Sequence, residues 1–283
     1  MLMVELKLKV SEAPDVRVVL PNRAENVAIV RQALTGIADA MRLDTGVLSD
    51  IKTAVSEACN NVVLHAYDGH EGPLEVYVCP TEDELDVVVR DEGLGIQPNP
   101  PEPDAGVQGV GLSLIQALTD HVEFRGASDE GTEVRMGFRA AGVVDSVAVQ
   151  EAERQVAPPN GDMVLSVAAG ALAAPVLGRV AAMLAARASF SVDRLADVVL
   201  VSDAIAAHAP ASIVGRHIHV GVDTSVGALD VRVGPLEPGG GERLVNASAL
   251  GGMPAVLSQL ADDVDVVTVD DGEQLRLRIT DAH

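Results

Sequence analysis

The chain is poor in aromatic residues and in basic residues. Phe, Tyr and Trp make up 2% of its 283 residues and Trp is absent, although hydrophobic residues reach 48%. A core of this composition must consist of aliphatic side chains. The 20 Lys and Arg stand against 42 Asp and Glu, which gives a formal net charge of −22. Nucleic acid and anionic membrane surfaces require basic patches, so this balance argues against either as a partner.

Cysteine and long apolar runs are also scarce. Cys59 and Cys79 are the only cysteines and lack metal-ligand spacing, so we expect reduced core thiols in a cytoplasmic protein. The sequence contains no apolar run of about 18 residues and no signal-peptide layout, so we expect neither a membrane span nor export. The length allows two ordinary domains.

The stretch from Leu48 to Tyr67 has the pattern of an amphipathic helix, because its apolar residues recur in steps of three and four. Its polar face carries Glu57, Asn61 and His65 at i, i+4 and i+8, one above the other. A carboxylate one turn before a carboxamide suits a site that needs a base beside a metal ligand. A solvated polar face is the alternative, and for an isolated helix it is the commoner one.

Short strands and helices alternate around this helix. Helical periodicity is found at 25–41 and 109–118, and strand-like runs are found at 4–10, 16–20, 74–79, 85–89, 122–126 and 132–138. Residues 97–108 are rich in Pro and show neither periodicity. A loop of this length inside a compact domain is usually functional, for example as a lid.

Two glycine motifs flank that loop. Asp91 follows a strand and precedes Gly93 and Gly95, while Gly109 and Gly111 introduce a helix. Glycines let the backbone turn sharply and approach a planar ligand closely. A carboxylate at a strand end can accept a hydrogen bond from an exocyclic amino group such as that of adenine, and a helix N-terminus favours phosphate. Each motif alone is more often a turn or a packing feature.

Together, in this order, the motifs resemble those of a known superfamily. SEACNNVVLHAY at 56–67 is similar to the N-box, DEGLGI at 91–96 to the first glycine box and GVGL at 109–112 to the second. These boxes belong to the ATP-binding fold shared by gyrase, histidine kinases and mismatch-repair ATPases. The S-E-A-x-x-N-x-x-x-H-A core and the terminal G-T-x-V strand most resemble the anti-sigma factor serine kinases, over about residues 15–140.

This resemblance implies two roles on the predicted helix. Glu57 would be the general base that takes the proton from an incoming serine hydroxyl. Asn61 would bind Mg²⁺, with the phosphates of ATP supplying further ligands. His65 also matches the family pattern, but for this residue we expect packing in the core.

The resemblance further implies an adenine and phosphate pocket. Asp91 would hold the adenine amino group. Gly93 and Gly95 would form the floor of the base pocket, and Thr132 would lie behind the adenine. The positions at the phosphates would be Gly109, Gly111 and Leu112. The implied cofactors are ATP and Mg²⁺. Members of the family commonly have a basic residue near the lid that meets the phosphates, but residues 97–118 contain no Lys or Arg. Only Mg²⁺ and the helix N-terminus would then neutralise the phosphate charge.

The second half of the sequence repeats the first. Residues 218–233 match residues 74–89 without a gap, at an offset of 144, and further matched runs follow in the same order. Such an ordered series of matches indicates a tandem duplication. We therefore expect an ATP-binding domain at 1–146, a polar linker at 147–161 and a second domain of the same fold at 162–283.

The second copy lacks the residues expected to bind nucleotide. Asp91 corresponds to Pro235, and Gly93 corresponds to Glu237. The run Gly239-Gly240-Gly241 is interpreted as a shortened, flexible lid remnant.

The second copy also lacks the metal ligand expected on the helix that corresponds to 48–67. If Asp203 matches Glu57, then Ala207 falls opposite Asn61, and a shift by one residue still leaves no asparagine there. Losing the adenine acceptor and the metal ligand together would make the second domain a pseudo-ATPase.

We therefore expect two tandem α/β sandwich domains of the histidine-kinase-like (Bergerat-type) ATPase fold, each with a mixed, mostly antiparallel sheet and helices on one face. The resemblance implies an anti-sigma regulatory serine kinase that phosphorylates an anti-sigma-factor antagonist or holds a sigma factor. A non-catalytic ATP-binding regulatory protein and a detached histidine-kinase catalytic domain are the alternatives. The second domain would serve as an intramolecular pseudo-dimer partner, which would leave the chain monomeric.

Overall fold

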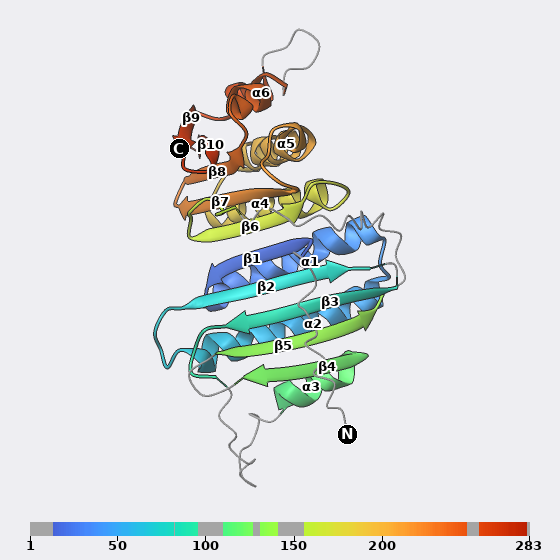
Figure 1. The fold of residues 1–283 in the computed structure, drawn as a ribbon. Helices are drawn as coiled ribbons and strands as arrows, with labels where there is room; N and C mark the ends of the chain where they lie inside the picture. Colours follow the sequence, from blue (N-terminus) through green and yellow to red (C-terminus); the bar gives the residue numbers. More distant parts are fainter. Residues whose placement is uncertain are drawn as a thin grey trace, which may run out of the picture.

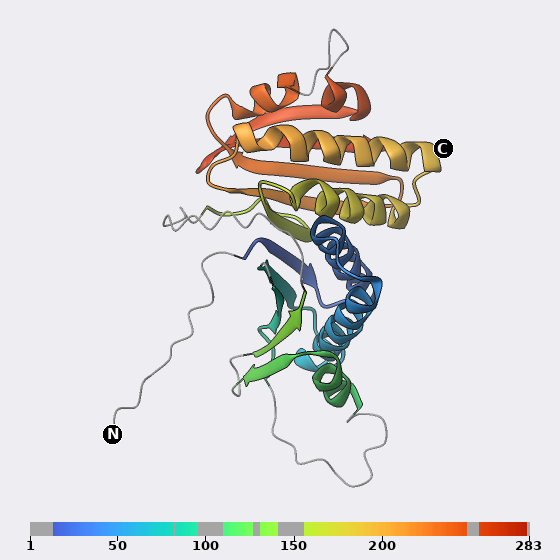
Figure 2. The ribbon, with the colours of Figure 1, turned by 90° about the vertical axis from the view of Figure 1, so that its right-hand side faces the viewer.

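The computed structural model describes residues 14–81, 83–95, 110–126, 131–140, 156–247 and 255–281. They form one sheet of ten strands in the order β4-β5-β3-β2-β1-β6-β7-β8-β10-β9 (Figure 1). All neighbouring strands among these residues are antiparallel. The expected α/β class with an antiparallel sheet is confirmed, and in the first half the helices cover one face (Figure 2).

The first half of the chain supplies one side of this sheet. Its elements are β1 (Val16–Pro21), α1 (Val27–Met41), α2 (Thr45–Asn61), β2 (Pro73–Pro80), β3 (Glu84–Asp91), α3 (Val110–Leu118), β4 (His121–Gly126) and β5 (Thr132–Arg139). These elements confirm the predicted helices and strands between 16 and 138 to within a few residues. The predicted strand at 4–10 and the predicted loop at 97–108 lie outside the described residues.

The core is aliphatic, as the composition requires. The apolar face of α2 is buried against the sheet, and the side chain of Asp44 caps this helix by accepting a hydrogen bond from the backbone N–H of Gly46 at 2.7 Å. Cys59 is buried on that face, but Cys79 on β2 is only half-buried, so it is not the core residue that was expected. Both thiols are free.

The second half repeats the same order with one extra helix. Its elements are β6 (Met163–Ala168), α4 (Ala173–Arg187), α5 (Val192–His208), β7 (His217–Ser225), β8 (Ala228–Leu236), α6 (Gly240–Ala247), α7 (Val256–Leu260), β9 (Asp263–Val269) and β10 (Gly272–Thr280). The glycine run expected to be a flexible remnant instead begins helix α6. None of the helices in the described part of the chain has the length and apolar character of a membrane span.

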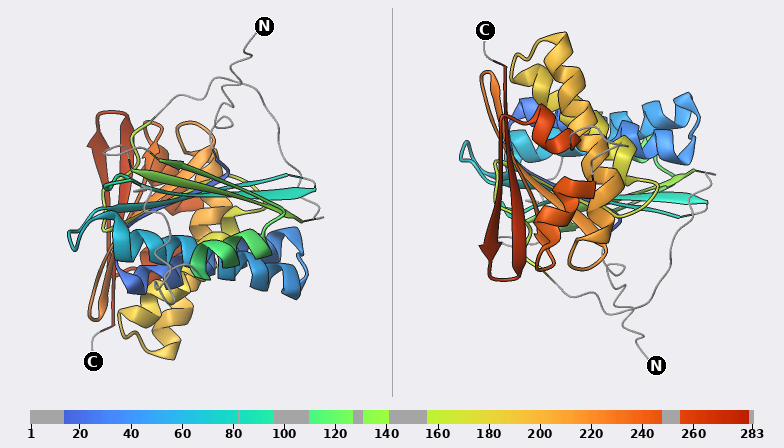
Figure 3. Two further views of the ribbon diagram at one scale, coloured as in Figure 1. Left: turned by 90° about the horizontal axis from the view of Figure 1, so that it is seen from below. Right: turned by 90° about the horizontal axis from the view of Figure 1, so that it is seen from above.

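The strand registers of the two halves agree. Val76 on β2 pairs with Val89 on β3, and Val220 on β7 pairs with Val233 on β8. Each residue of the second pair lies 144 positions after its counterpart, which is the offset found in the sequence. The sheet twists strongly from β4 to β9, so the strands at its two ends run in different directions (Figure 3).

The two halves meet through the β1–β6 ladder. β1 begins at Val16 and β6 begins at Met163. Val18 and Leu165 therefore hold the same position in their strands, and they pair directly with each other. A pair of equivalent residues facing each other is the sign of an isologous, two-fold-like contact.

The helices α1 and α4 cross closely beside this ladder. A Cβ atom at Gly36 of α1 would lie 2.6 Å from the carbonyl oxygen of Pro175 and 2.7 Å from the Cα of Val176. Arg179 of α4 donates from Nε and Nη2 to Oδ2 of Asp39 on α1, at 3.0 and 2.8 Å. The halves are thus joined by a hydrogen-bonded ladder, a backbone contact and an ion pair.

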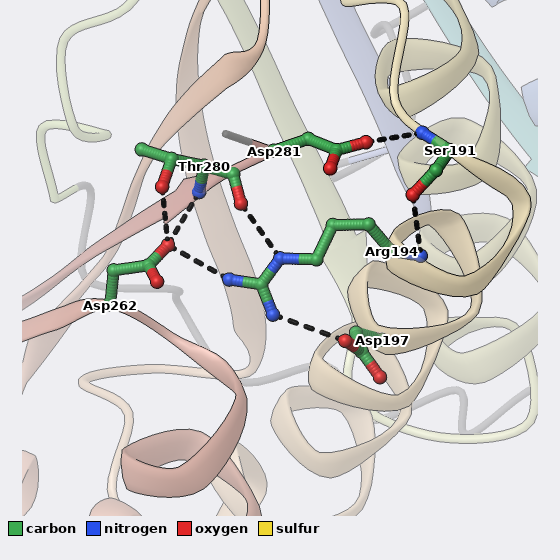
Figure 4. Close-up of polar contacts among 6 residues, drawn as sticks. All are labelled: Ser191, Arg194, Asp197, Asp262, Thr280 and Asp281. Carbon is green, nitrogen blue, oxygen red and sulfur yellow. Dashed lines mark hydrogen bonds and ion pairs between the residues drawn. The ribbon is translucent and has the colours of Figure 1, made fainter. Parts of the chain in front are cut away.

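A polar cluster fastens α5 to the outer strands of the second half (Figure 4). Arg194 donates from Nη2 to Asp262 at 2.8 Å, from Nη1 to Asp197 at 3.1 Å and from Nε to the carbonyl oxygen of Thr280 at 2.8 Å. Burial disfavours the ionised form of Asp262, but hydrogen bonds from Thr280 and the charge of Arg194 outweigh it and lower the pKa of this carboxyl. The cluster fixes one end of α5 over the sheet.

The close helix crossing predicts opposite effects at two helical glycines. Gly36→Ala should lower the free energy of unfolding by about 1–3 kcal/mol, because the new methyl group must push α4 away. Gly178→Ala is the matched control, since its Cβ would find its nearest neighbour at 3.7 Å. This second change should raise stability by roughly 0.5–1 kcal/mol through helix propensity alone. Denaturant unfolding of the full chain measures both, and a fully stable Gly36→Ala protein would contradict the crossing.

Candidate functional site

Asp91 lies at the end of β3 and is only 2% exposed. Its Oδ1 accepts hydrogen bonds from the backbone N–H groups of Gly93 at 2.8 Å and Thr132 at 3.2 Å. Burial raises the pKa of this carboxyl, and the hydrogen bonds from Gly93 and Thr132 oppose that rise. A buried carboxylate held in one orientation is suited to recognise a hydrogen-bond donor.

Glycines hold the backbone around Asp91 in contact with neighbouring segments. A Cβ at Gly93 would lie 2.0 Å from the carbonyl oxygen of Ala66, which also accepts the N–H of Leu94 at 2.9 Å. Gly131 has a φ of +76°, and its Cβ would lie 2.1 Å from the carbonyl oxygen of Asp91. Because a side chain would collide at either position, the first glycine motif and the start of β5 close tightly around the carboxylate.

A second group of predicted residues meets between α2 and α3. A Cβ at Gly111, in the first turn of α3, would lie 2.1 Å from Oε1 of Glu57 on α2. Asn61 follows one turn later on α2 and is half-buried. The structure therefore brings the predicted base close to the start of α3, with the predicted metal ligand on the same helix face.

The remaining predicted positions differ in how far the structure places them. Gly95 follows the first glycine motif in the left-handed backbone region, with a φ of +74°. Leu112 lies on α3 and is half exposed. Gly109 lies outside the described residues.

The end of α2 contains a feature that periodicity does not predict. Residues Val62–Ala66 form a π-helical turn, in which Val62 and Ala66 are buried. His65 is exposed, so the expectation that it packs in the core is wrong. The π-helical turn packs its two ends, Val62 and Ala66, inward and leaves His65 at the surface.

Tyr67 is a site-forming residue that the sequence analysis did not single out. Its hydroxyl donates to the carbonyl oxygen of Pro73 at 2.6 Å and accepts the backbone N–H of Glu92 at 2.8 Å. A Cβ at Gly72 would lie 2.2 Å from the ring. Tyr67 therefore fixes the backbone of the first glycine motif to the start of β2. The glycine at 72, directly before a strand, was the available signal.

The corresponding positions of the second half carry different chemistry. α2 and α5 each have 17 residues, and aligning their ends places Ala204 opposite Glu57 and His208 opposite Asn61. The expected match of Asp203 with Glu57 is therefore off by one residue. One more residue separates α4 from α5 than separates α1 from α2, which accounts for the shift. No asparagine falls opposite Asn61 in either alignment.

Within the described ranges, no group of three or more His, Cys, Asp or Glu side chains could hold a metal ion. The side-chain oxygens of Asn61 and Glu57 are the hard donors that Mg²⁺ prefers, but they are too few to coordinate it alone. A magnesium ion at this position would need oxygen ligands from a bound molecule.

The comparisons with known proteins define the class first. Residues 20–138, which contain both groups of site residues, match the family described as the histidine kinase-like ATPase domain. This match lies within the first half of the chain, from the end of β1 to the end of β5.

Curated relatives then define the family within that class. The serine-protein kinase RsbW of Bacillus pumilus is 35% identical over 132 residues, which is 41% of this chain and 80% of that protein. The serine-protein kinase RsbW of Bacillus mycoides is 34% identical over 129 residues, with 41% and 79% covered. The chain belongs to this family of histidine kinase-like ATPases.

Solved structures resemble the chain over shorter shares. A blue-light activated histidine kinase of Erythrobacter litoralis has a TM-score of 0.31 and 21% identity, and the match covers 35% of this chain and 32% of that one. The RsbU and RsbW domains of a Mycobacterium tuberculosis protein give a TM-score of 0.34 and 19% identity, with 44% and 31% covered. In both, less than half of either chain is matched.

The position of Tyr67 predicts a local effect of removing its hydroxyl. Tyr67→Phe should keep the ring packing but release the Glu92 amide, at a cost of about 1 kcal/mol. Hydrogen exchange of that amide should become faster, by roughly tenfold. Tyr77→Phe, which removes a hydroxyl from β2, is the control and should leave the Glu92 amide unchanged. Equal exchange in Tyr67→Phe and the unaltered protein would contradict the assigned anchor.

Proposed function

We propose that this protein is an anti-sigma regulatory serine kinase that binds Mg-ATP in its first domain, residues 1–146. Membership of the RsbW family supports this assignment. The observation that carries it is the placement of Glu57 against the first turn of α3, with the buried acceptor Asp91 at the end of β3. These two groups would serve the phosphate end and the base end of one nucleotide.

At the base end, Asp91 would accept a hydrogen bond from the adenine amino group. Its Oδ1 is already oriented by Gly93 and Thr132, so little ordering would remain to be done on binding. Gly93 and Gly95 would let the ring approach the backbone, because neither carries a side chain.

At the phosphate end, the start of α3 would offer backbone N–H groups to the phosphates. Mg²⁺, when bound, would neutralise phosphate charge, and Asn61 would hold it together with phosphate oxygens. Glu57 would accept the proton of an incoming serine hydroxyl. Phosphoryl transfer needs mainly positioning and charge neutralisation, so one carboxylate and one metal ion suffice.

For the second domain, residues 162–283, we propose the role of a fixed intramolecular partner that binds no nucleotide. Pro235 and Ala204 stand where the first domain has Asp91 and Glu57. The two-fold-like β1–β6 contact and the α1–α4 crossing support a pseudo-dimer within one chain. The composite surface would then face a sigma factor or an anti-sigma-factor antagonist.

One observation favours a second candidate function, an ATP-gated interaction protein without phosphotransfer. The segment 97–118 has no Lys or Arg, so no basic side chain from it could stabilise charge on the transferred phosphoryl group. Such a protein would bind nucleotide at the same site and use it to set the shape of a binding surface.

The first functional prediction concerns Asp91. Asp91→Asn should weaken Mg-ATP or Mg-ADP binding by about 1–3 kcal/mol, because an amide can present a donor to the adenine amino group. Burial raises the pKa of Asp91, so the affinity of the unaltered protein should fall on acidification sooner than for an ordinary aspartate. The variant should lack this pH dependence.

Calorimetry on the full chain measures the affinity at each pH. Asp86→Asn is the matched control, because Asp86 lies on the same strand but pairs with His121 at 3.5 Å instead of facing the site. Unchanged affinity in Asp91→Asn would remove this residue from the pocket, and more than one nucleotide per chain would contradict the role proposed for the second domain.

The second functional prediction concerns Glu57. Glu57→Gln should keep nucleotide affinity within a few-fold but lower phosphotransfer by roughly 10²–10⁴. Radiolabel transfer from γ-labelled ATP to candidate antagonist proteins measures the rate, with Glu84→Gln at the far end of β3 as the control. An unaffected rate in Glu57→Gln would exclude it as the base, and the absence of transfer in the unaltered protein would favour the second candidate.

A further inference from the structure

The carboxylate of Glu273 binds the N-terminus of α6. Its Oε1 accepts the backbone N–H of Gly239 at 2.8 Å, and its Oε2 accepts that of Gly241 at 3.0 Å. Both oxygens are therefore engaged by the first turn of a helix, where N–H groups lack partners within the helix and favour negative charge. The hydrogen bonds from Gly239 and Gly241 also lower the pKa of Glu273.

The strand registers identify Glu273 as the counterpart of Thr132. Each follows a glycine at the start of the last strand, and each pairs with the end of the preceding strand, Thr132 with Gly126 and Glu273 with Thr268. In the first half, Thr132 binds Asp91. In the second half Pro235 on β8 takes the place of that carboxylate. The acceptor carboxylate of the second half is instead Glu273 on β10, the counterpart of β5.

The first turn of α6 packs closely against the elements beneath it. A Cβ at Gly240 would lie 3.0 Å from the carbonyl oxygen of Ser212, and a Cβ at Gly241 would lie 2.5 Å from Val266. Both glycines are buried. These two glycines thus allow the helix to lie directly on β9 and on the loop that follows α5.

We propose that Glu273 is a built-in anion that fixes the N-terminus of α6 at the edge of the degenerate site, so that the second half keeps one conformation without a bound nucleotide. The carboxylate takes the place that a bound anion would take at a helix N-terminus. This inference rests on the proposed assignment of the second half as a degenerate copy. It does not depend on phosphotransfer by the first half.

Hydrogen exchange of the full-length chain, followed by mass spectrometry in the absence of nucleotide, tests the inference. Glu273→Gln keeps the shape of the side chain and one acceptor oxygen, and it should speed exchange at 239–247 by roughly tenfold. Glu273→Thr, which installs the first-half residue, should speed it further. Exchange at 110–118 should stay unchanged in both variants.

Glu242→Gln is the matched control, because this glutamate lies in the same turn of α6 but is exposed. It should change exchange at 239–247 far less than either Glu273 variant, because its carboxylate lies in solvent. Equal protection of α6 in the unaltered protein and both Glu273 variants would overturn the proposal. Since no nucleotide enters this measurement, failure of the proposed kinase function in the first half would leave its result intact.

Discussion

The antiparallel ladder between β1 and β6 is the contact on which the arrangement of the whole chain depends. Within the described residues, it joins two units of five strands into one sheet and covers the edge strand that each unit would otherwise expose. Backbone hydrogen bonds fix its register, and the pairing of Val18 with Leu165 sets the two-fold-like axis. The crossing of α1 over α4 follows from this axis, because equivalent helices of the two units must then meet on the same side of the sheet.

The polar contacts across this junction do not share its symmetry. Arg179 binds Asp39, and Arg187 of α4 donates to Asn26 at 2.9 Å. Both cations come from the second half and both acceptors from the first. The ladder is thus a contact that two copies of one unit could make, whereas the side-chain bonds suit a pair of unlike units. The half-exposed ion pair contributes little stability by itself, but it distinguishes unlike from like pairing.

The sequence predicted most of the fold because periodicity and turn residues are local signals. The strands around Asp91 and the helix that carries Glu57 follow directly from them, and the constant offset of 144 predicted the matching registers of β2–β3 and β7–β8. The errors occur where longer-range packing decides the outcome. The π-helical turn at Val62–Ala66 left His65 exposed, and one extra residue before α5 shifted the alignment of the second copy.

Two site features depend on partners that no local pattern identifies. Tyr67 acts through backbone groups of Glu92 and Pro73, which sequence distance does not connect. In the sequence, the glycine run at 239–241 has the composition of a flexible loop. In the structure it begins a helix, because Glu273, more than thirty residues later, supplies the carboxylate that caps it. Glycine permits both outcomes, so the partner decides which one occurs. The same limit applies to Gly111, whose close contact with Glu57 depends on how α3 packs against α2.

The joining of both units in one chain also changes how their pairing responds to dilution. Two separate chains associate according to their concentration, and a scarce protein would spend part of its time dissociated. A tether of ordinary length instead supplies an effective concentration on the order of millimolar, whatever the copy number. The paired state of this protein is therefore independent of its abundance. Its ratio of candidate nucleotide sites to composite surfaces is also one to one, half that of a pair of identical units.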